Sequence, residues 1–247
     1  MLEGYAPGYA QDALSMMNTR TASDRAAFAR PLCTPGSRVL DLGCGQGSIL
    51  SSVAPDVRVI CVDVRPSAPA SPSTTDYVAG AVYALPFAAS SIDVVFAHSL
   101  FEHLSDPHAA LAEIRRILRP GGRLALAAPD WSRAKIRPRT ANVDAALRGY
   151  YLVRRRAGGD PFAGRAIAAH VANAGFTDIV ERARFREELS YRSLAAYMES
   201  RLAVALSESG ANDRDQVTSA ARSAWSWART AAVGDFQQCW QELTATC

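Results

Sequence analysis

The chain contains a single lysine, Lys135, and its formal net charge is only +3. A net charge this small does not indicate a polyanionic partner such as nucleic acid. Residues 133–156 are a local exception, because their basic residues are opposed by Asp144 alone and are interleaved with Tyr150 and Tyr151. They could form a nucleic-acid-binding stripe, but since arginine supplies nearly all the positive charge of this chain, we favour a solvated segment. The basic residues are Arg133, Lys135, Arg137, Arg139, Arg148, Arg154, Arg155 and Arg156.

The chain also lacks any apolar stretch near the roughly 20 residues that cross a bilayer. Its start has neither the basic region nor the apolar region of a signal peptide. Its five cysteines are odd in number and show no paired metal-ligand spacing, which favours reduced thiols and no metal site. We therefore expect a cytoplasmic protein without membrane contact, a monomer or a homodimer. With 247 residues and 49% hydrophobic content, one domain with an insertion is expected.

The most informative segment runs from Val39 to Ser48 and reads VLDLGCGQGS. Its apolar start is typical of a strand buried on both faces, and its three alternate glycines let backbone amides approach a ligand. Residues 48–53 are expected to open a helix whose N-terminal amides face the same ligand. The motif alone is also compatible with a plain strand-to-helix turn, and Cys44 with a small residue that fits such a turn.

A second apolar strand, predicted at 57–63, ends in Asp63. In a parallel βαβ unit this position carries the carboxylate that receives ribose hydroxyls. A carboxylate gains nothing from core packing, so acids at two neighbouring strand ends are better explained by a ligand. Together, Asp41 and Asp63 indicate a nucleotide-like cofactor.

Strands and helices are expected to alternate, which predicts an α/β fold: a Rossmann-like, mostly parallel seven-stranded sheet with its last strand antiparallel and helices on both faces. Residues 66–75 are too rich in proline for a covering helix. Helices are expected from Ser23 to Arg30, stopping before Pro31, and at 107–118, 164–174, 191–208 and 214–232. The predicted strands cover 38–42, 57–63, 76–80, 92–98, 123–128, 179–185 and, as a terminal edge strand, 236–245.

We expect these elements to form a single domain covering 1–247. Residues 1–37 would form an N-terminal helical cap, and 38–128 the cofactor-binding core. Residues 129–163 and 190–234 would form helical insertions that cover the substrate over the active site.

The chain resembles the class I S-adenosylmethionine-dependent methyltransferases, most closely their small-molecule type 11 branch. The resemblance rests on the segment 39–47 with Asp63 and on five later motifs, and it covers about 37–128 well. The later motifs are LPF at 85–87, SIDVVFAH at 91–98, EHL at 102–104, DP at 106–107 and RPGG at 119–122.

The resemblance implies S-adenosylmethionine as cofactor and S-adenosylhomocysteine as its product. Asp41 and the glycine loop would hold the methionine moiety, Asp63 the ribose, and residues after the third strand the adenine. Arg20 is a candidate for the methionine carboxylate or an ordinary surface residue. The full set of expected cofactor-binding residues is Arg20, Asp41, Gly43, Cys44, Gly45, Gly47, Asp63, Val64, Arg65, Ala81, Val82 and His98.

One position departs from the family pattern. Family members usually carry an acid after the glycine that ends the third strand, where it accepts the adenine amino proton, but here Gly80 is followed by Ala81. We therefore expect backbone groups and apolar walls to hold the adenine, with Tyr83 also nearby.

The expected reaction is methyl transfer to an N, O or C atom of a small, aromatic molecule of specialised metabolism, by in-line displacement. Two alternatives stay open: an RNA- or protein-modifying methyltransferase, and a non-catalytic partner protein that only binds S-adenosylmethionine. A dinucleotide cofactor fits less well, because its fingerprint would need glycine at Ser48.

His98 and His103 are the candidate catalytic bases, since a neutral histidine can take a proton from the nucleophile. Both also have structural interpretations, His98 as a core residue and His103 as a helix-packing residue. Glu102 is expected to be solvated or to cap a helix.

Aromatic residues are expected to bind or enclose the substrate, which suits a flat or cationic small molecule. Trp225 and Trp227 are more simply explained as core residues of the helical insertion. The candidate substrate-binding residues are Tyr5, Tyr9, Phe101, Trp131 and Tyr150, with Tyr151, Tyr191 and Tyr197 as further aromatic surfaces.

The ribose assignment predicts that Asp63→Ala weakens cofactor binding strongly, because the substitution removes the acceptor for the ribose hydroxyls. Isothermal calorimetry with S-adenosylmethionine measures the effect. Unchanged binding would refute the assignment of Asp63.

Overall fold

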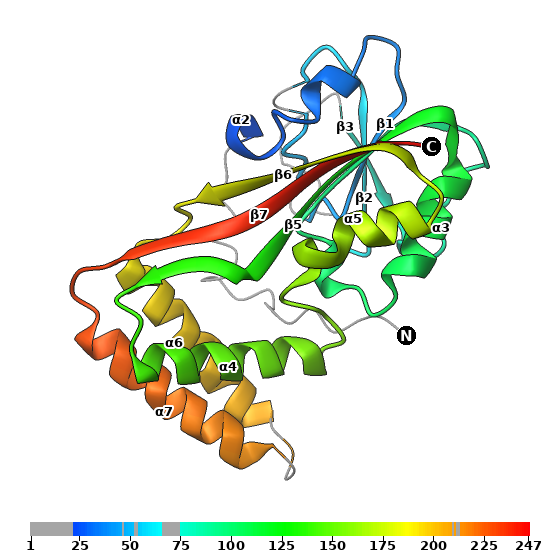
Figure 1. Ribbon diagram of the computed structural model, residues 1–247. Coiled ribbons are helices and arrows are strands. Elements are labelled where there is room, and N and C mark those ends of the chain that lie inside the picture. The colour runs from blue at the N-terminus through cyan, green and yellow to red at the C-terminus, as the bar shows by residue number, and fades with distance from the viewer. Residues whose placement is uncertain (1–21, 46, 52–53, 66–74, 209, 211–212) are drawn as a thin grey trace.

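The computed structural model describes residues 22–45, 47–51, 54–65, 75–208, 210 and 213–247. Its centre is a seven-stranded sheet in the order β3-β2-β1-β4-β5-β7-β6 (Figure 1). Strands β1 to β5 pair in parallel, and β7 is antiparallel to both β5 and β6. The predicted fold class is confirmed. The strands are β1 (Val39–Leu42), β2 (Val59–Asp63), β3 (Thr75–Ala79), β4 (Ile92–His98), β5 (Leu118–Arg137), β6 (Thr177–Arg186) and β7 (Asp235–Thr246).

The central strands are buried on both faces, as expected for a covered parallel sheet. On one face, helices α3 (Pro107–Ile117) and α5 (Ala163–Asn173) contribute to the largest hydrophobic cluster. The opposite face packs against Ala26, Ala29 and Leu50.

The sequence explains where α3 and α5 begin and end. Asp106 caps α3 by accepting a hydrogen bond from the Ala109 amide at 2.9 Å, and Pro107 occupies the first turn, where its missing N–H costs nothing. After α5, Gly175 has φ +84°, and its amide donates to the carbonyl of Ala172. This left-handed residue ends the helix where the sequence predicts.

The N-terminal segment differs from its prediction. Helix α2 covers only Ala22–Arg25, and a 3-10 helix, η1 (Arg30–Leu32), runs through Pro31 rather than stopping before it. Residues 48–51 were expected to open a helix but form bends and a turn. Ser48 nevertheless acts like a helix cap, since its hydroxyl oxygen accepts from the amides of Leu50 and Ser51. The crossover at 66–74 lies outside the described residues.

Strand β7 was predicted as an edge strand, and this is wrong. It lies between β5 and β6, so β3 and β6 form the edges of the sheet. The edge prediction failed because both faces of β7 are covered, although its sequence contains glutamine and threonine among the apolar residues. Its polarity indicated an exposed strand, whereas several of these polar side chains are buried.

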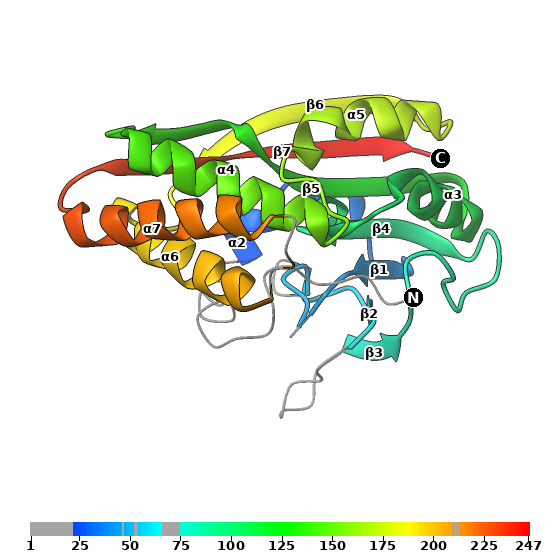
Figure 2. The same cartoon turned by 90° about the horizontal axis from the view of Figure 1, so that it is seen from below.

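Strand β5 is much longer than the predicted 123–128. Past Ala128 it continues to Arg137, within the segment 129–163 that was expected to form an insertion, and pairs there with the first half of β7. The outer end of this β5–β7 ladder carries the helical layer (Figure 2). The layer consists of α4 (Ala141–Arg156), α6 (Tyr191–Glu208) and α7 (Arg214–Thr230), which pack with Ile136 and Phe236 in a second hydrophobic cluster.

Helices α4 and α7 approach each other closely at Gly149. A Cβ atom there would lie 2.2 Å from the Cβ atom of Ala220, so any larger residue forces the helices apart. Trp227, buried in this layer as predicted, is 2% exposed, but Trp225 is 52% exposed with the Arg229 guanidinium 4.0 Å from its ring. The core prediction for Trp225 is therefore wrong.

We predict that Gly149→Ala destabilises the protein, although alanine is the better helix former by about 1 kcal/mol. The clash with Ala220 should cost about 1–3 kcal/mol of overpacking, which outweighs that gain. Urea unfolding measures the difference, with the exposed neighbour Arg148→Ala as the matched control. A more stable Gly149→Ala variant contradicts the close approach.

Candidate active site

Two acids meet beside the glycine loop at the carboxyl ends of β1 and β2. Asp63 accepts two hydrogen bonds, from the Gly45 amide at 2.9 Å and from the Arg65 amide at 3.0 Å. Gly43 and Gly45 have φ of +78° and +55°, which glycine adopts without strain. A Cβ atom on Gly43 would lie 3.1 Å from the Leu100 side chain. The loop therefore needs glycine for its backbone shape and for its contact with the segment after β4.

Asp41 is buried inside this turn, with 3% of its surface exposed. Ser48 donates its hydroxyl hydrogen to Asp41 at 2.6 Å. Burial, with a smaller contribution from the charge of Asp63, raises the pKa of Asp41 to about 7, although the hydrogen bond from Ser48 acts in the opposite direction. The ionised form of Asp41 is thus disfavoured unless a positive charge lies beside it.

These features fit S-adenosylmethionine, which carries a sulfonium and an ammonium group. A cation beside Asp41 and Asp63 would compensate the charge that burial disfavours. The amides of the glycine-rich turn leave room for close backbone contact with a ligand. The residues present therefore suit this cofactor at its methionine and ribose ends.

The expected adenine neighbours surround the end of β3. Val64 is 46% exposed, Val82 is buried in the main cluster, and Ala81 forms an isolated bridge with Ala84. On the other side, Cys44 faces the buried Cys61, and this contact together with burial raises the pKa of the Cys44 thiol. Because residue 81 is alanine and not an acid, Val64, Ala81 and Val82 can contact a ligand only through apolar side chains and backbone groups.

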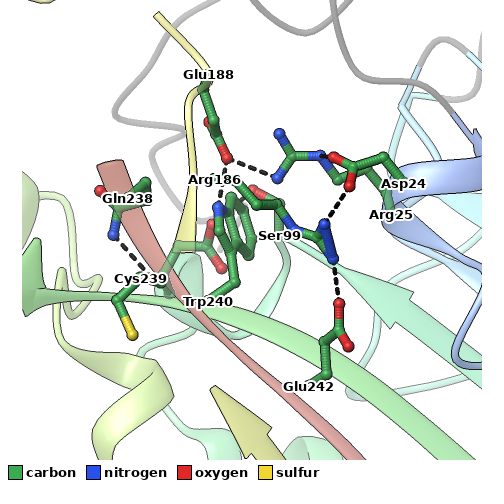
Figure 3. A network of polar contacts seen from close by, with 10 residues as sticks. Asp24, Arg25, Ser99, Arg186, Glu188, Gln238, Cys239, Trp240 and Glu242 are labelled. Carbon is green, nitrogen blue, oxygen red and sulfur yellow. Dashed lines mark hydrogen bonds and ion pairs between the residues drawn. The ribbon is translucent and has the colours of Figure 1, made fainter. Parts of the chain in front are cut away.

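At the end of β4, His98 stacks on Trp240 of β7. Their ring centroids are 4.6 Å apart with an interplanar angle of 20°. The Trp240 indole donates its Nε1 hydrogen to Glu188, and the Arg25 guanidinium lies 5.3 Å from the Trp240 ring (Figure 3). The sequence did not indicate Trp240, because the strand that carries it is more than 130 residues away from His98.

Charged side chains behind Trp240 tie the N-terminal helix to the sheet. Arg25 of α2 pairs with Glu188 at 2.6 Å, and Arg186 of β6 contacts both Asp24 and Glu242 (Figure 3). The side chains of Arg25 and Glu188 are 5% and 8% exposed. Because each buried charge has a partner of opposite sign, the network orients Trp240 without leaving a bare ion.

Directly after His98, the chain turns through Ser99 at φ +59° into the 3-10 helix η2 (Phe101–His103). The Ser99 hydroxyl donates to Glu102 at 2.6 Å, and His103 Nε2 lies 3.7 Å from the same carboxylate oxygen. Glu102 is 2% exposed, so the expectation that it is solvated is wrong. The loop 158–160 covers it, with the Asp160 amide donating to the Glu102 carbonyl. Ser99, Glu102 and His103 thus form one connected group.

The structure separates the aromatic candidates for the substrate site. Trp131 is half-buried, stacks on Phe236 at 5.8 Å and meets Tyr150 edge-on at 5.3 Å. Tyr150 is buried in the helical layer with Tyr197, and Phe101 is buried in the main cluster, where packing accounts for its burial. Tyr5, Tyr9 and Arg20 lie outside the described residues.

The basic side chains of the segment 133–156 have different surroundings. Arg154 is 5% exposed inside the fold, Arg139 pairs with Asp144 at 2.6 Å, and Arg156 pairs with Asp213. Lys135 lies over the Phe185 ring at 3.9 Å. The burial of Arg154 departs from the expectation of a solvated segment.

Within the described part of the chain, no three or more histidine, cysteine or acidic side chains gather as a metal site would require. In the same part, no helix combines the length and apolar character that a bilayer crossing demands.

Known proteins show which family this geometry belongs to. Residues 40–126 match the family model of a methyltransferase domain. A demethylmenaquinone methyltransferase of Renibacterium salmoninarum is 32% identical over 178 residues, covering 66% of this chain and 71% of that protein. A 27-O-demethylrifamycin SV methyltransferase of Amycolatopsis mediterranei is 34% identical over 133 residues, 48% of each chain.

Among solved structures, a phosphoethanolamine N-methyltransferase 2 of Haemonchus contortus in complex with S-adenosyl-L-methionine shares the fold. Its TM-score is 0.51 at 18% identity, over 97% of this chain and 52% of that one. Against two further curated relatives, the matched stretch spans 31% and 56% of their lengths. The chain thus spans only part of several proteins that it matches.

The raised pKa of Asp41 makes a prediction about stability in the absence of cofactor. Its folded pKa of about 7 lies above the ordinary value of 3.8, so the folded state binds the extra proton between pH 4 and 7. This group's contribution to stability therefore falls as pH rises through that window. Asp41→Asn should remove this pH dependence. From pH 5 to pH 8, the free energy of unfolding of the variant should rise by roughly 2–3 kcal/mol relative to that of the wild type. Urea unfolding at both pH values measures this, and a parallel response of the two proteins contradicts it.

Proposed function

The chain belongs to the class I S-adenosylmethionine-dependent methyltransferases, and we propose that it transfers the methyl group to an N, O or C atom of a small aromatic molecule of specialised metabolism. The proposal rests on the side chains at the carboxyl ends of the neighbouring strands β1, β2 and β4. Asp41 and Asp63 flank the glycine loop at the ends of β1 and β2, and β4 next to β1 ends in His98, followed by the group of Ser99, Glu102 and His103.

We assign the cofactor contacts by this arrangement. Asp41 and the turn at 43–47 would hold the methionine part, and Asp63 the ribose, with one carboxylate oxygen already oriented by Gly45. Val64, Arg65, Ala81 and Val82 would border the adenine. The cofactor supplies a methyl group on a positively charged sulfur, which is activated before the protein acts on it.

The protein's own residues then align the acceptor and exclude water. His103 is the proposed base, because its ring is 11% exposed and lies beside the buried Glu102 carboxylate. That carboxylate would stabilise the protonated imidazole after it takes the acceptor's proton. His98 is held against Trp240, which suits a ring that shapes the site at the end of β4.

The substrate class draws support from the aromatic surroundings and from relatives. Trp131 stacks on Phe236 where β5 and β7 extend past β4, and Trp240 lies four residues further along β7, against His98. Two relatives carry names of small-molecule methyltransferases, one for demethylmenaquinone and one for 27-O-demethylrifamycin SV. We propose that the segments 129–163 and 190–234 cover this substrate, within a single domain.

All five cysteines are free. Reduced thiols suit a cytoplasmic enzyme, which is the location that we propose. The proposal does not require a partner chain, because the acids, the glycine loop and His103 come from one chain.

Cofactor binding and turnover test the function directly. Calorimetry should detect binding of S-adenosylmethionine and S-adenosylhomocysteine, and labelled methyl groups should appear on small aromatic acceptors. Absence of any binding heat ends the enzyme hypothesis. Binding without methylation of any acceptor supports the non-catalytic alternative instead.

We predict that His103→Asn slows turnover by about 10²-fold or more while leaving cofactor affinity near normal, because a general base contributes a factor of roughly that size. Steady-state kinetics and calorimetry measure the two quantities. The matched control is His108→Asn, an exposed histidine on α3 that pairs with His170 rather than Glu102. Full activity of His103→Asn removes it from the catalytic residues.

A further inference from the structure

Gln238 of β7 is buried with one polar atom left over. The residue is 2% exposed, and its amide nitrogen donates to the Cys239 carbonyl at 2.9 Å (Figure 3). Its amide oxygen has no hydrogen-bond partner among the residues that the structure describes. Such an oxygen destabilises a folded protein unless something donates to it.

The position of Gln238 sets it apart from other buried polar groups. Side chains two residues apart on a strand share a face, so Gln238 lies between Phe236 and Trp240, about 7 Å from each. Trp240 stacks on His98, and Phe236 stacks on Trp131. Gln238 therefore lies on β7 between the ring pair of His98 and Trp240 and the ring pair of Trp131 and Phe236.

On the side of β5, Gln238 has no cross-strand partner among the described residues. Asp130 pairs with Cys239 and Lys135 with Gln237, so residues 131–134 bulge away from the ladder at this point. Bulges often redirect a side chain at a functional site. The same bulge contains Trp131, whose ring stacks on Phe236.

The groups nearby define what could complete this oxygen. It accepts hydrogen bonds only, and the aromatic side chains of Phe236 and Trp240 lie on either side of Gln238 on the same face of β7. A ligand that fits must therefore bring an N–H or O–H donor on a flat ring that lies against the aromatic side chains.

We propose that Gln238 is a specificity-determining residue, whose amide oxygen accepts a hydrogen bond from a hydroxyl or amino group of an aromatic substrate. This donor is a second group on the ring, distinct from the atom that receives the methyl group. The inference rests on the proposed methyltransferase function and narrows its substrate class to aromatic molecules with two adjacent donors.

The test compares catechol and 2-aminophenol with phenol as acceptors, using methyl-labelled S-adenosylmethionine and the full chain. Phenol has one hydroxyl group and therefore no second donor. In the wild-type protein, KM for phenol should exceed KM for catechol by about tenfold, the effect of one neutral hydrogen bond. In Gln238→Met, which keeps the volume and removes the acceptor, the two KM values should agree within about twofold, while kcat changes little.

Gln241→Met is the matched control. Gln241 lies on the same strand but on the opposite face, and its buried amide oxygen is also without a partner among the described residues. This variant should keep the wild-type preference for catechol. Calorimetry with S-adenosylmethionine should give equal affinity for all three proteins.

The outcomes separate the two proposals. If the wild-type protein does not bind S-adenosylmethionine, the proposed function itself is overturned. Normal cofactor binding without methylation of catechol or 2-aminophenol overturns the role of Gln238, as does an unchanged phenol-to-catechol ratio in Gln238→Met. If Gln238→Met does not fold, the wild-type ratio decides, because equal KM values for phenol and catechol contradict the second hydrogen bond.

Discussion

The pairing of β5 with β7 is the constraint on which the rest of the structure depends. The ladder runs from Arg123 opposite Thr246 to Arg137 opposite Asp235, with one bulge. Its inner part completes the sheet beside the cofactor strands. Its outer part projects beyond them and carries α4, α6 and α7 through Ile136 and Phe236. One antiparallel pairing therefore joins the cofactor half to the helical half, and it brings Trp240 against His98.

Charge is handled in two different ways on the two sides of the site. Around the glycine loop, burial raises the pKa of Asp41 to about 7, and the charge of Asp63 adds a smaller effect in the same direction. Behind Trp240, the acids Glu188 and Glu242 are matched by Arg25 and Arg186. The first arrangement leaves room for a cationic ligand, while the second needs no ligand and serves to hold the indole and α2 in place.

Particular elements show why some predictions succeeded and others did not. The helices α3 and α5 follow from local signals, namely the apolar spacing, the cap at Asp106 and the left-handed Gly175. The edge assignment of β7 and the short β5 were wrong because strand pairing is non-local, and polarity alone does not say which faces are covered. Glu102 was misjudged for the same reason: loop 158–160, more than 50 residues away, covers it.

The sequence by itself determined the fold class, the glycine turn with Asp41 and Asp63, and the family, because these depend on short patterns whose spacing sets the backbone. Only the tertiary structure decided which side chains share the site with that turn. The stacking of His98 on Trp240, the group of Ser99, Glu102 and His103, and the partnerless oxygen of Gln238 arise from contacts between strands and loops distant in the chain. Packing free energy selects such contacts across the whole molecule, and no local pattern records them.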